Sequence, residues 1–357
     1  MPQSSISPKQ VIHILHSKQP HACIDVRSEG EWQKAESPGF HNLPVLNNQE
    51  RHEVGICYKK HGAQAAIDLG EELVAPHRQA RIDAWINYAA GRPTIVACWR
   101  GGMRSGKTAN ILRAHGLTVQ TVQGGYKAIR SVYLDYLERS LPKLVVLSGL
   151  TGVNKTGLIQ SCSSLSVDLE KHANHRGSTF GHYPDQSQPA QASFENSIAF
   201  DLMASKSPTI LLEDESSHIG RVRLPHALRE KMIKSPVIVL EADMEARVQH
   251  IFEEYIMHPL DSGQELNEIH SLAKSNLNRI ERRLGGKKKK EIETAMHAAF
   301  SSPDLKAENH FDWISDLLVT YYDPMYRFGQ DRNPRPTLFK GDFTSCMTWI
   351  QNHLTSV

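Results

Sequence analysis

Short apolar runs rich in β-branched residues alternate with amphipathic stretches along the first two thirds of the chain. Such runs, bounded by turn residues, are typical of strands buried in a parallel sheet, and the stretches between them are typical of covering helices. The pattern therefore predicts an α/β fold with mainly parallel sheets. The strands are expected at 22–27, 94–99, 117–122, 143–149, 209–214 and 236–242.

Helices are predicted between these strands, and two of them start near Ser105 and Lys155. A third, over 193–206, repeats apolar residues at spacing four, as a helix with one buried face does. From about residue 245 onward the pattern becomes helical and charged, and it contains no clear strand.

The clearest domain boundary lies near Pro142, because an amphipathic helix precedes it and a new strand follows. We therefore expect a first α/β domain at 1–140 and a second at 143–245. The remaining residues, 246–357, are expected to form a helical basic extension that packs on the second domain.

The composition is that of an ordinary globular protein, with 357 residues, 39% hydrophobic residues and a net charge of 41 − 39 = +2. It excludes disordered and collagen-like chains. No apolar run approaches the ~18 residues of a membrane span, and the first residues do not resemble a signal peptide. The cysteines are scattered and form no C-x-x-C pair, which indicates a reducing, cytoplasmic setting rather than disulfides or a thiolate metal site. They are Cys23, Cys57, Cys98, Cys162 and Cys346.

The first candidate site is the loop CWRGGMRS, which follows the apolar run TIVA. A glycine-rich turn between a strand and a helix points backbone N–H groups at an anion. Cys98 begins this loop, where such groups and the cations Arg100 and Arg104 would favour a nucleophilic thiolate. The other residues of the predicted anion cradle are Gly101, Gly102, Met103 and Ser105.

The same segment also satisfies the phosphate-loop pattern G-x-x-x-x-G-K-[ST] over residues 101–108. We reject that interpretation, because the strand ends near Trp99 and Gly106, Lys107 and Thr108 would then already lie within the helix.

The second candidate site, over 149–156, matches the same pattern except that Asn154 replaces the last glycine. Asparagine tolerates positive φ better than most residues, so the loop is expected to keep its shape. Lys155 would contact a terminal phosphate, and Thr156 could hold Mg²⁺ if a metal is used. The full predicted diphosphate-binding set is Gly149, Thr151, Gly152, Asn154, Lys155 and Thr156.

Two further segments carry polar groups that could serve these loops. Glu213 or Asp214, at the end of an apolar strand, is expected to be the acidic partner of the second loop. The segment 168–181 mixes histidines and carboxylates without a register that gathers metal ligands, so we expect a substrate-facing loop and no metal site. The expected substrate-facing residues are His175, Arg176, Gly177 and Ser178.

A basic stretch near residue 280 fits contact with a nucleic-acid backbone as well as it fits a solvated helix face. Its members are Arg279, Arg282, Arg283, Lys287, Lys288, Lys289 and Lys290. Downstream, Tyr321, Tyr322 and Tyr326 suit base stacking and core packing equally.

Eight segments, in this order along the chain, resemble the tRNA 2-selenouridine synthase family, in which a rhodanese-like domain is joined to a phosphate-loop domain. Together they span most of the sequence and form a highly specific combination. They are 25–32, 37–70, 98–105, 124–130, 149–156, 168–181, 211–225 and 321–326.

The resemblance implies that Cys98 carries the chalcogen as a covalent adduct and that selenium replaces sulfur in 2-thiouridine at the wobble position of tRNA. It also implies selenophosphate as the selenium donor and geranyl diphosphate as the donor for an S-geranyl intermediate. The family's phosphate loop maps onto Gly149–Thr156, where Asn154 departs from the usual glycine. We further expect no tightly bound cofactor, a monomer, no membrane association and a separate enzyme that supplies selenophosphate.

Three alternatives remain open at this stage. Cys-x5-Arg also describes phosphatases that form phosphocysteine, although those usually place His where this chain has Ala97. The second loop could belong to a nucleotide-dependent kinase or switch. A non-catalytic tRNA-binding module of rhodanese type is the third alternative, against which the intact Cys98 and Arg104 argue.

Overall fold

The computed structural model of the protein describes residues 4–178, 180–182, 187–332 and 334–354. Thr179, within the segment 168–181, lies outside the described residues. The chain divides into two compact units, the first formed by Met1–Leu141 with Pro189–Ala204 and the second by Pro142–Gln188 with Ser205–Val357.

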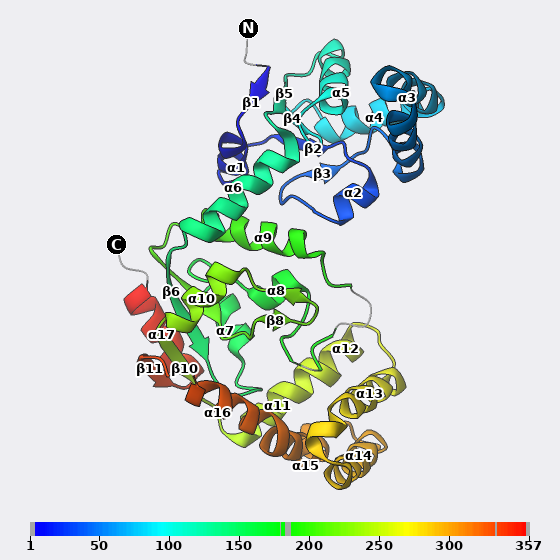
Figure 1. Cartoon of the computed structure of the whole chain (residues 1–357). Helices are drawn as coiled ribbons and strands as arrows, with labels where there is room; N and C mark the ends of the chain where they lie inside the picture. The colour runs from blue at the N-terminus through cyan, green and yellow to red at the C-terminus, as the bar shows by residue number, and fades with distance from the viewer. Residues whose placement is uncertain (1–3, 179, 183–186, 333, 355–357) are drawn as a thin grey trace. The chain divides into compact units, whose positions relative to one another are not determined.

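The first unit contains a five-stranded parallel sheet in the order β1-β5-β4-β2-β3. Its strands are β1 (Ser5–Ile6), β2 (Ala22–Asp25), β3 (His41–Asn42), β4 (Thr94–Ala97) and β5 (Val119–Val122). Helices α4 and α5 pack their apolar side chains on one face, while α1 and α6 lie on the other (Figure 1). The helices are α1 (Pro8–His16), α2 (Glu29–Gln33), α3 (Asn48–Val74), α4 (Arg78–Ala89), α5 (Met103–Ala114), α6 (Gly125–Arg139) and α9 (Gln191–Ala204).

Helix α9 corrects the domain boundary expected from the sequence, which assigned this helix to the second domain. In the structure α9 packs along α6 within the first unit (Figure 1). Its stripe of Phe194, Ile198 and Leu202 is buried, as the spacing predicts. The Tyr136 hydroxyl donates to the Leu202 carbonyl oxygen at 3.1 Å, which fixes the two helices together.

The second unit has a four-stranded parallel sheet in the order β11-β10-β6-β7. Its strands are β6 (Lys143–Ser148), β7 (Thr209–Glu213), β10 (Val237–Leu240) and β11 (Thr337–Gly341), and β8 (His218–Ile219) and β9 (Val222–Arg223) form a separate antiparallel pair. Helices α7 and α17 cover one face of the sheet with a buried apolar layer. The short helices of this part are α7 (Lys155–Ser161), α8 (Leu169–Ala173), α10 (His226–Lys234) and α17 (Phe343–Leu354).

A helical layer follows β10, with its own core around Phe252, Phe300 and Trp313. It consists of α11 (Met244–Phe252), the π-helical turn η2 (Glu253–Met257), α12 (His258–Asp261), α13 (Leu266–Leu284), α14 (Gly286–Phe300), α15 (Ala307–Leu317), the π-helical turn η3 (Leu318–Tyr322) and α16 (Asp323–Arg332). The expectation of no strand after residue 245 is wrong, because β11 returns to the sheet and pairs with β10.

Candidate functional site

Cys98 lies where β4 ends and the predicted cradle begins. Its side chain is 4% exposed, and its sulfur lies 3.2 Å from the Ser105 hydroxyl oxygen. That hydroxyl also donates to the Gly102 carbonyl oxygen at 3.1 Å. Because a hydroxyl has a single proton, Ser105 can turn it from this carbonyl to a sulfur that has lost its own.

Two glycines hold the loop against the start of α6. Gly101 has φ +66°, and a Cβ there would lie 2.4 Å from the Val122 carbonyl oxygen. Gly125 has φ +60°, and a Cβ there would lie 2.2 Å from the Cys98 carbonyl oxygen. The Tyr126 N–H donates to that same oxygen at 2.8 Å. Sequence reasoning missed this role of Gly125, for which the Gly-Gly pair was the only signal.

Arg104 is held by Glu31, to which it donates from both terminal nitrogens at 2.6 and 3.2 Å. Burial lowers the pKa of Arg104, but the hydrogen bonds and charge of Glu31 and the nearby Cys98 sulfur outweigh this and raise it. Arg104 therefore supplies a fixed positive charge beside Cys98. Its guanidinium is held by Glu31 and is not free to move toward a bound anion.

A cavity of about 1270 Å³ opens over this loop, within the first unit. Cys98 and the predicted residues Arg100, Gly102, Met103 and Arg104 line it. Its aromatic residues include Trp99 and Tyr58, the latter 60% exposed. Further cations in the lining are Lys34, Arg51, Lys59, Arg78, Arg81, Lys107 and Arg130. Such a cavity suits a large anionic ligand with a flat ring.

The rejection of 101–108 as a phosphate loop is confirmed. Helix α5 begins at Met103, so Gly106, Lys107 and Thr108 lie within it. Lys107 pairs with Glu71 of α3, and Thr108 is buried.

Below the loop, a buried ion pair joins Arg27 to Asp25 at 2.8 Å. The Arg27 guanidinium also lies 3.9 Å from the centre of the Tyr126 ring. Burial raises the pKa of Asp25, and Arg27 opposes that rise. The pair stabilises the end of β2 under the cradle. From the sequence, the segment 25–32 is notable only for its resemblance to a known family, and no role for this ion pair is predicted.

The second loop joins β6 to α7 and keeps its shape as predicted. Asn154 adopts the left-handed conformation, with φ +68° and ψ +43°, and its side-chain oxygen accepts the Gly157 N–H at 3.0 Å. Gly149 and Gly152 also have positive φ. The departure from the glycine of the pattern is therefore accommodated by a side chain that caps the following helix.

Lys155 folds back over this loop and donates to the carbonyl oxygens of Gly149 and Leu150 at 2.8 and 3.2 Å. Burial lowers its pKa, against the nearby charges of Glu170 and Glu215. An anion in the loop would offer the ammonium group a stronger acceptor than these carbonyls. Its contact with a phosphate stays a prediction.

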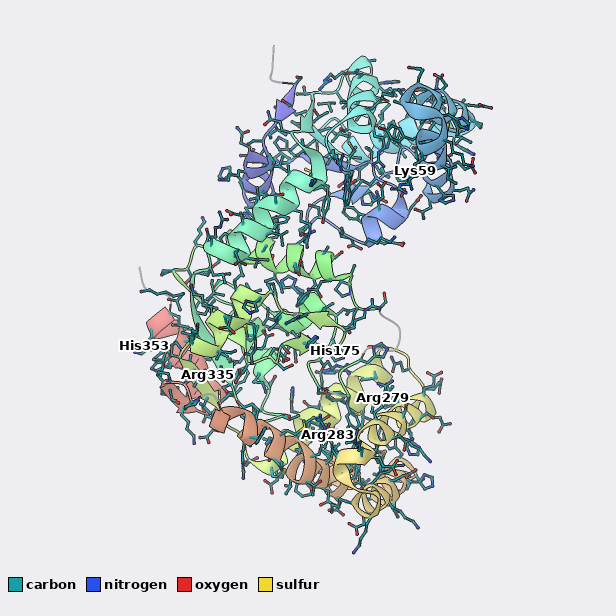
Figure 2. All side chains as sticks on the ribbon, viewed as in Figure 1. Lys59, His175, Arg279, Arg283, Arg335 and His353 are labelled. Carbon is teal, nitrogen blue, oxygen red and sulfur yellow. The ribbon has the colours of Figure 1, made fainter. Side chains whose placement is uncertain are left out.

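The two predicted acids lie in different surroundings. Glu213 is buried and accepts the Leu169 N–H at 3.0 Å, and burial raises its pKa well above the ordinary value. Asp214 accepts from Ser148 at 2.7 Å and pairs with Arg335, which is labelled in Figure 2.

Glu170 and Glu215 are the acids closest to Lys155 and Thr156 of the loop. The sequence did not identify either of them as a partner of this loop. The Thr156 hydroxyl donates to Glu170 at 2.7 Å, and Glu170 shares a hydrogen bond with Glu215. These carboxylates come from α8 and from the end of β7. Only the fold brings them to the loop.

The predicted substrate-facing loop contacts Glu254 and Tyr255. Arg176 pairs with Glu254 at 2.8 Å and stacks 4.8 Å from the Tyr255 ring centre, while Ser178 lies 3.0 Å from the Tyr255 hydroxyl. Gly177 has φ +67°. His175 is buried, and burial lowers its pKa.

An apolar cavity of about 250 Å³ begins at this loop and runs into the helical layer. Thr151, Arg176 and Ser178 are among its polar lining residues, together with His258, Ser262, Gln264 and Asn276. Apolar side chains from α11, the two π-helical turns and α13 to α15 form most of the rest: Ile251, Tyr255, Ile256, Ile269, Leu272, Ala273, Phe300, Trp313, Ile314, Leu317, Leu318 and Tyr322. The sequence did not reveal this cavity, since its walls lie far apart along the chain.

The three downstream tyrosines differ in role. Tyr321 is buried in the core of the helical layer, and Tyr322 lines the apolar cavity. Tyr326 contacts the second loop, since its hydroxyl accepts the Gly149 N–H. Arg247 holds the other end of this loop by donating to the Thr151 carbonyl oxygen at 2.8 Å.

The basic stretch spans α13 and α14, and Arg279 and Arg283 both come from α13 (Figure 2). Lys288 pairs with Asp316 and Lys289 with Glu281. The exposed members are Arg279, Arg282, Arg283, Lys287 and Lys290.

Two features are absent from the part of the chain that the structure describes. No helix in that part of the chain is long and apolar enough to cross a membrane. No group of three or more His, Cys, Asp or Glu side chains placed to hold a metal ion occurs there either.

Two known protein families match this chain, each over a different part of the sequence. Residues 142–357 match the tRNA 2-selenouridine synthase AAA domain, and residues 7–131 match the rhodanese-like domain.

Two curated proteins named tRNA 2-selenouridine synthase are similar over most of their length. The one from Shewanella piezotolerans is 38% identical over 98% of this chain and 99% of its own. The one from Alcanivorax borkumensis is 39% identical over 89% and 92%. Among solved structures, the N-terminal domain of a putative ATP/GTP binding protein from Clostridium difficile covers 36% of this chain and 98% of its own, with 32% identity and a TM-score of 0.34.

Proposed function

The chain belongs to the tRNA 2-selenouridine synthase family, and we propose that it converts wobble 2-thiouridine in tRNA to 2-selenouridine through an S-geranyl intermediate. One observation is the main support for the proposed geranyl step. Thr151 of the phosphate loop lines a mainly apolar cavity. A prenyl diphosphate has this same pairing of a diphosphate with a hydrocarbon chain.

In the geranyl step, the loop Gly149–Thr156 holds the diphosphate of geranyl diphosphate and the apolar cavity holds its chain. Each buried CH₂ group contributes about 0.8 kcal/mol to binding. Lys155 moves from its carbonyl acceptors to the departing diphosphate and stabilises the charge that develops there. The thiocarbonyl sulfur attacks the prenyl carbon, and the alkylated sulfur becomes a good leaving group.

In the selenium step, the Cys98 loop binds selenophosphate, whose tetrahedral anion suits a cradle of inward N–H groups beside a fixed Arg104 charge. Cys98 attacks C2 of the S-geranyl base, and geranylthiol leaves. The selenium of selenophosphate then attacks C2 and displaces the Cys98 thiolate, and water cleaves the phosphorus–selenium bond to release phosphate, so selenium stays at the selenide level throughout. The burial of Cys98 at the floor of a large cavity supports this role. Trp99 and Tyr58 offer faces on which an unstacked base could lie.

For the tRNA itself, we propose that the exposed cations of α13 and α14 contact phosphates of its backbone. Lys288 and Lys289 already pair with carboxylates, so they contribute less than Arg279, Arg282 and Arg283. Neutralising one such contact weakens binding and lowers its salt dependence by about one unit of slope.

The test is mass spectrometry of the wobble nucleoside after incubation with thiolated tRNA. With geranyl diphosphate alone we expect S-geranyl-2-thiouridine, and with selenophosphate added we expect 2-selenouridine. Absence of both products would overturn the proposal. Hydrolysis of an aryl phosphate that is lost on Cys98→Ser would favour the phosphatase alternative, and turnover of ATP or GTP would favour the kinase alternative.

A further inference from the structure

S-alkylation of 2-thiouridine leaves one proton to be removed. The sulfur forms a bond to the prenyl carbon, and the bond from that carbon to the diphosphate oxygen breaks with its electron pair. The C2–N3 bond becomes double, and the N3 proton must go to a base. Neither of the two reactive groups assigned above, Lys155 and Cys98, is placed to take this proton. Lys155 faces the diphosphate, and Cys98 belongs to the first unit.

We propose that the carboxylate pair Glu170–Glu215 is the general base that takes the N3 proton; this inference rests on the proposed geranyl transfer. A built Cβ on Gly177 would lie 2.3 Å from Glu170 Oε1 and 2.5 Å from Glu215 Oε1, so both oxygens face the substrate loop. The neighbours of Gly177, Arg176 and Ser178, line the mouth of the apolar cavity.

The pair also contacts the phosphate loop, because Thr156 donates to Glu170 at 2.7 Å. It therefore contacts both the phosphate loop and the segment whose residues Arg176 and Ser178 line the prenyl cavity. The attacking base must enter at this junction, since the bond that breaks joins the diphosphate to the chain. A base within hydrogen-bond reach of the transferred proton is the geometric requirement for general catalysis.

The two carboxyl groups lie close enough to interact, so the protonation of one changes the pKa of the other. Burial raises the pKa of both, and the negative charge of Glu170 adds to the rise at Glu215. Because burial raises its pKa, ionised Glu170 is a stronger base than a solvated carboxylate. The other charged or titratable groups that face it are Lys155, Asp168, Glu213, Asp214, Arg229 and Tyr255.

The experiment compares geranyl transfer by wild type, Glu170→Gln and Glu215→Gln across a range of pH, with geranyl diphosphate and thiolated tRNA. We expect kcat near neutral pH to fall by roughly 10²–10⁴-fold in the glutamine variants. Binding of geranyl diphosphate should be kept, which also shows that the variants are folded. Glu241→Gln, whose carboxylate pairs with Lys340, is the matched control and should behave as wild type.

The pH profile distinguishes a base from a structural residue. As the pH rises toward the ionisation of N3–H, the substrate loses the proton without help, so the rates of the variants should rise toward wild type. A loss independent of pH, a loss restored by added Mg²⁺, or wild-type rates in both variants would overturn the inference. If wild type itself forms no S-geranyl nucleoside, the proposed function fails and the inference fails with it.

Discussion

The carbonyl oxygen of Cys98 occupies the space that a Cβ of Gly125 would need, at 2.2 Å. The position of the nucleophile is thus set by a backbone contact between the end of β4 and the start of α6. The conformation of Gly125, φ +60°, is also one that residues with a side chain rarely adopt.

Gly125→Ala should therefore displace the Cys98 loop. We expect a loss of stability of about 1–3 kcal/mol and a loss of selenium transfer, with geranyl transfer largely kept because its groups lie in the second unit. Gly91→Ala is the control, since Gly91 has φ +74° but nothing within 4 Å of its built Cβ. Equal effects of the two substitutions on selenium transfer would contradict the role assigned to the contact.

Cys98→Ser should stop selenium transfer and leave geranyl transfer running, because a hydroxyl at this position is a far weaker nucleophile and leaving group than the thiolate. The wobble nucleoside should then accumulate as the S-geranyl form. Cys57→Ser, on α3, is the control and should make 2-selenouridine normally. Production of 2-selenouridine by the Cys98→Ser protein at the wild-type rate would remove Cys98 from the mechanism.

Local chemistry made both loops predictable from the sequence. The turn at Cys98 and the left-handed Asn154 depend on residues within a few positions, whose conformational preferences are intrinsic. The same reasoning excluded Lys107 as a phosphate ligand, because the helix start at Met103 follows from where the strand ends.

The junction of Glu170, Glu215 and Gly177 could not be predicted, since the segment 168–181 and the residues after β7 meet there through the fold alone. The strand β11 was missed because a long helical layer separates it from its partner β10. The apolar stripe of α9 predicted a buried face correctly, but periodicity does not say which core buries it.

Lys155→Ala should reduce geranyl transfer by roughly 10²–10³-fold, the effect of removing one donor that stabilises developing charge. The measurement is the initial rate of S-geranyl formation with geranyl diphosphate as the sole donor. Lys107→Ala tests the other lysine that fits the phosphate-loop pattern and should leave this rate unchanged, since Lys107 pairs with Glu71 on α3. Unchanged transfer in Lys155→Ala would exclude the second loop from the reaction.

His310 should make the helical layer sensitive to acid. Burial, with a smaller effect of His270, lowers its pKa to about 4, and its Nδ1 accepts the Trp313 indole N–H at 3.0 Å. The unfolded chain takes the proton at about pH 6.5. As the pH falls from there to about 4, the folded state loses about 3 kcal/mol relative to the unfolded state.

The check is urea unfolding of wild type and His310→Gln at several pH values between 7 and 4. Glutamine keeps an acceptor for the indole but does not ionise in this range. The wild type should lose stability faster than the variant as the pH falls. Parallel curves would show that His310 does not titrate as its burial implies.

Ala273→Phe should fill part of the apolar cavity, because Ala273 lines it from α13 among larger apolar side chains. We expect the KM for geranyl diphosphate to rise and S-geranyl formation to fall, since the added ring takes the space of the prenyl chain. Selenium transfer to tRNA that already carries S-geranyl-2-thiouridine should stay near wild type, because that step depends on Cys98 in the first unit.

Ser271→Phe provides the control, since Ser271 is exposed on the same helix and an added ring there enters no cavity. The two variants thus add the same side chain to one helix and differ in where it goes. If Ala273→Phe is folded and transfers geranyl with an unchanged KM, the prenyl chain binds elsewhere and the cavity is a packing defect of the helical layer. If it instead accepts a shorter prenyl diphosphate better than geranyl diphosphate, the cavity sets the chain length of the donor.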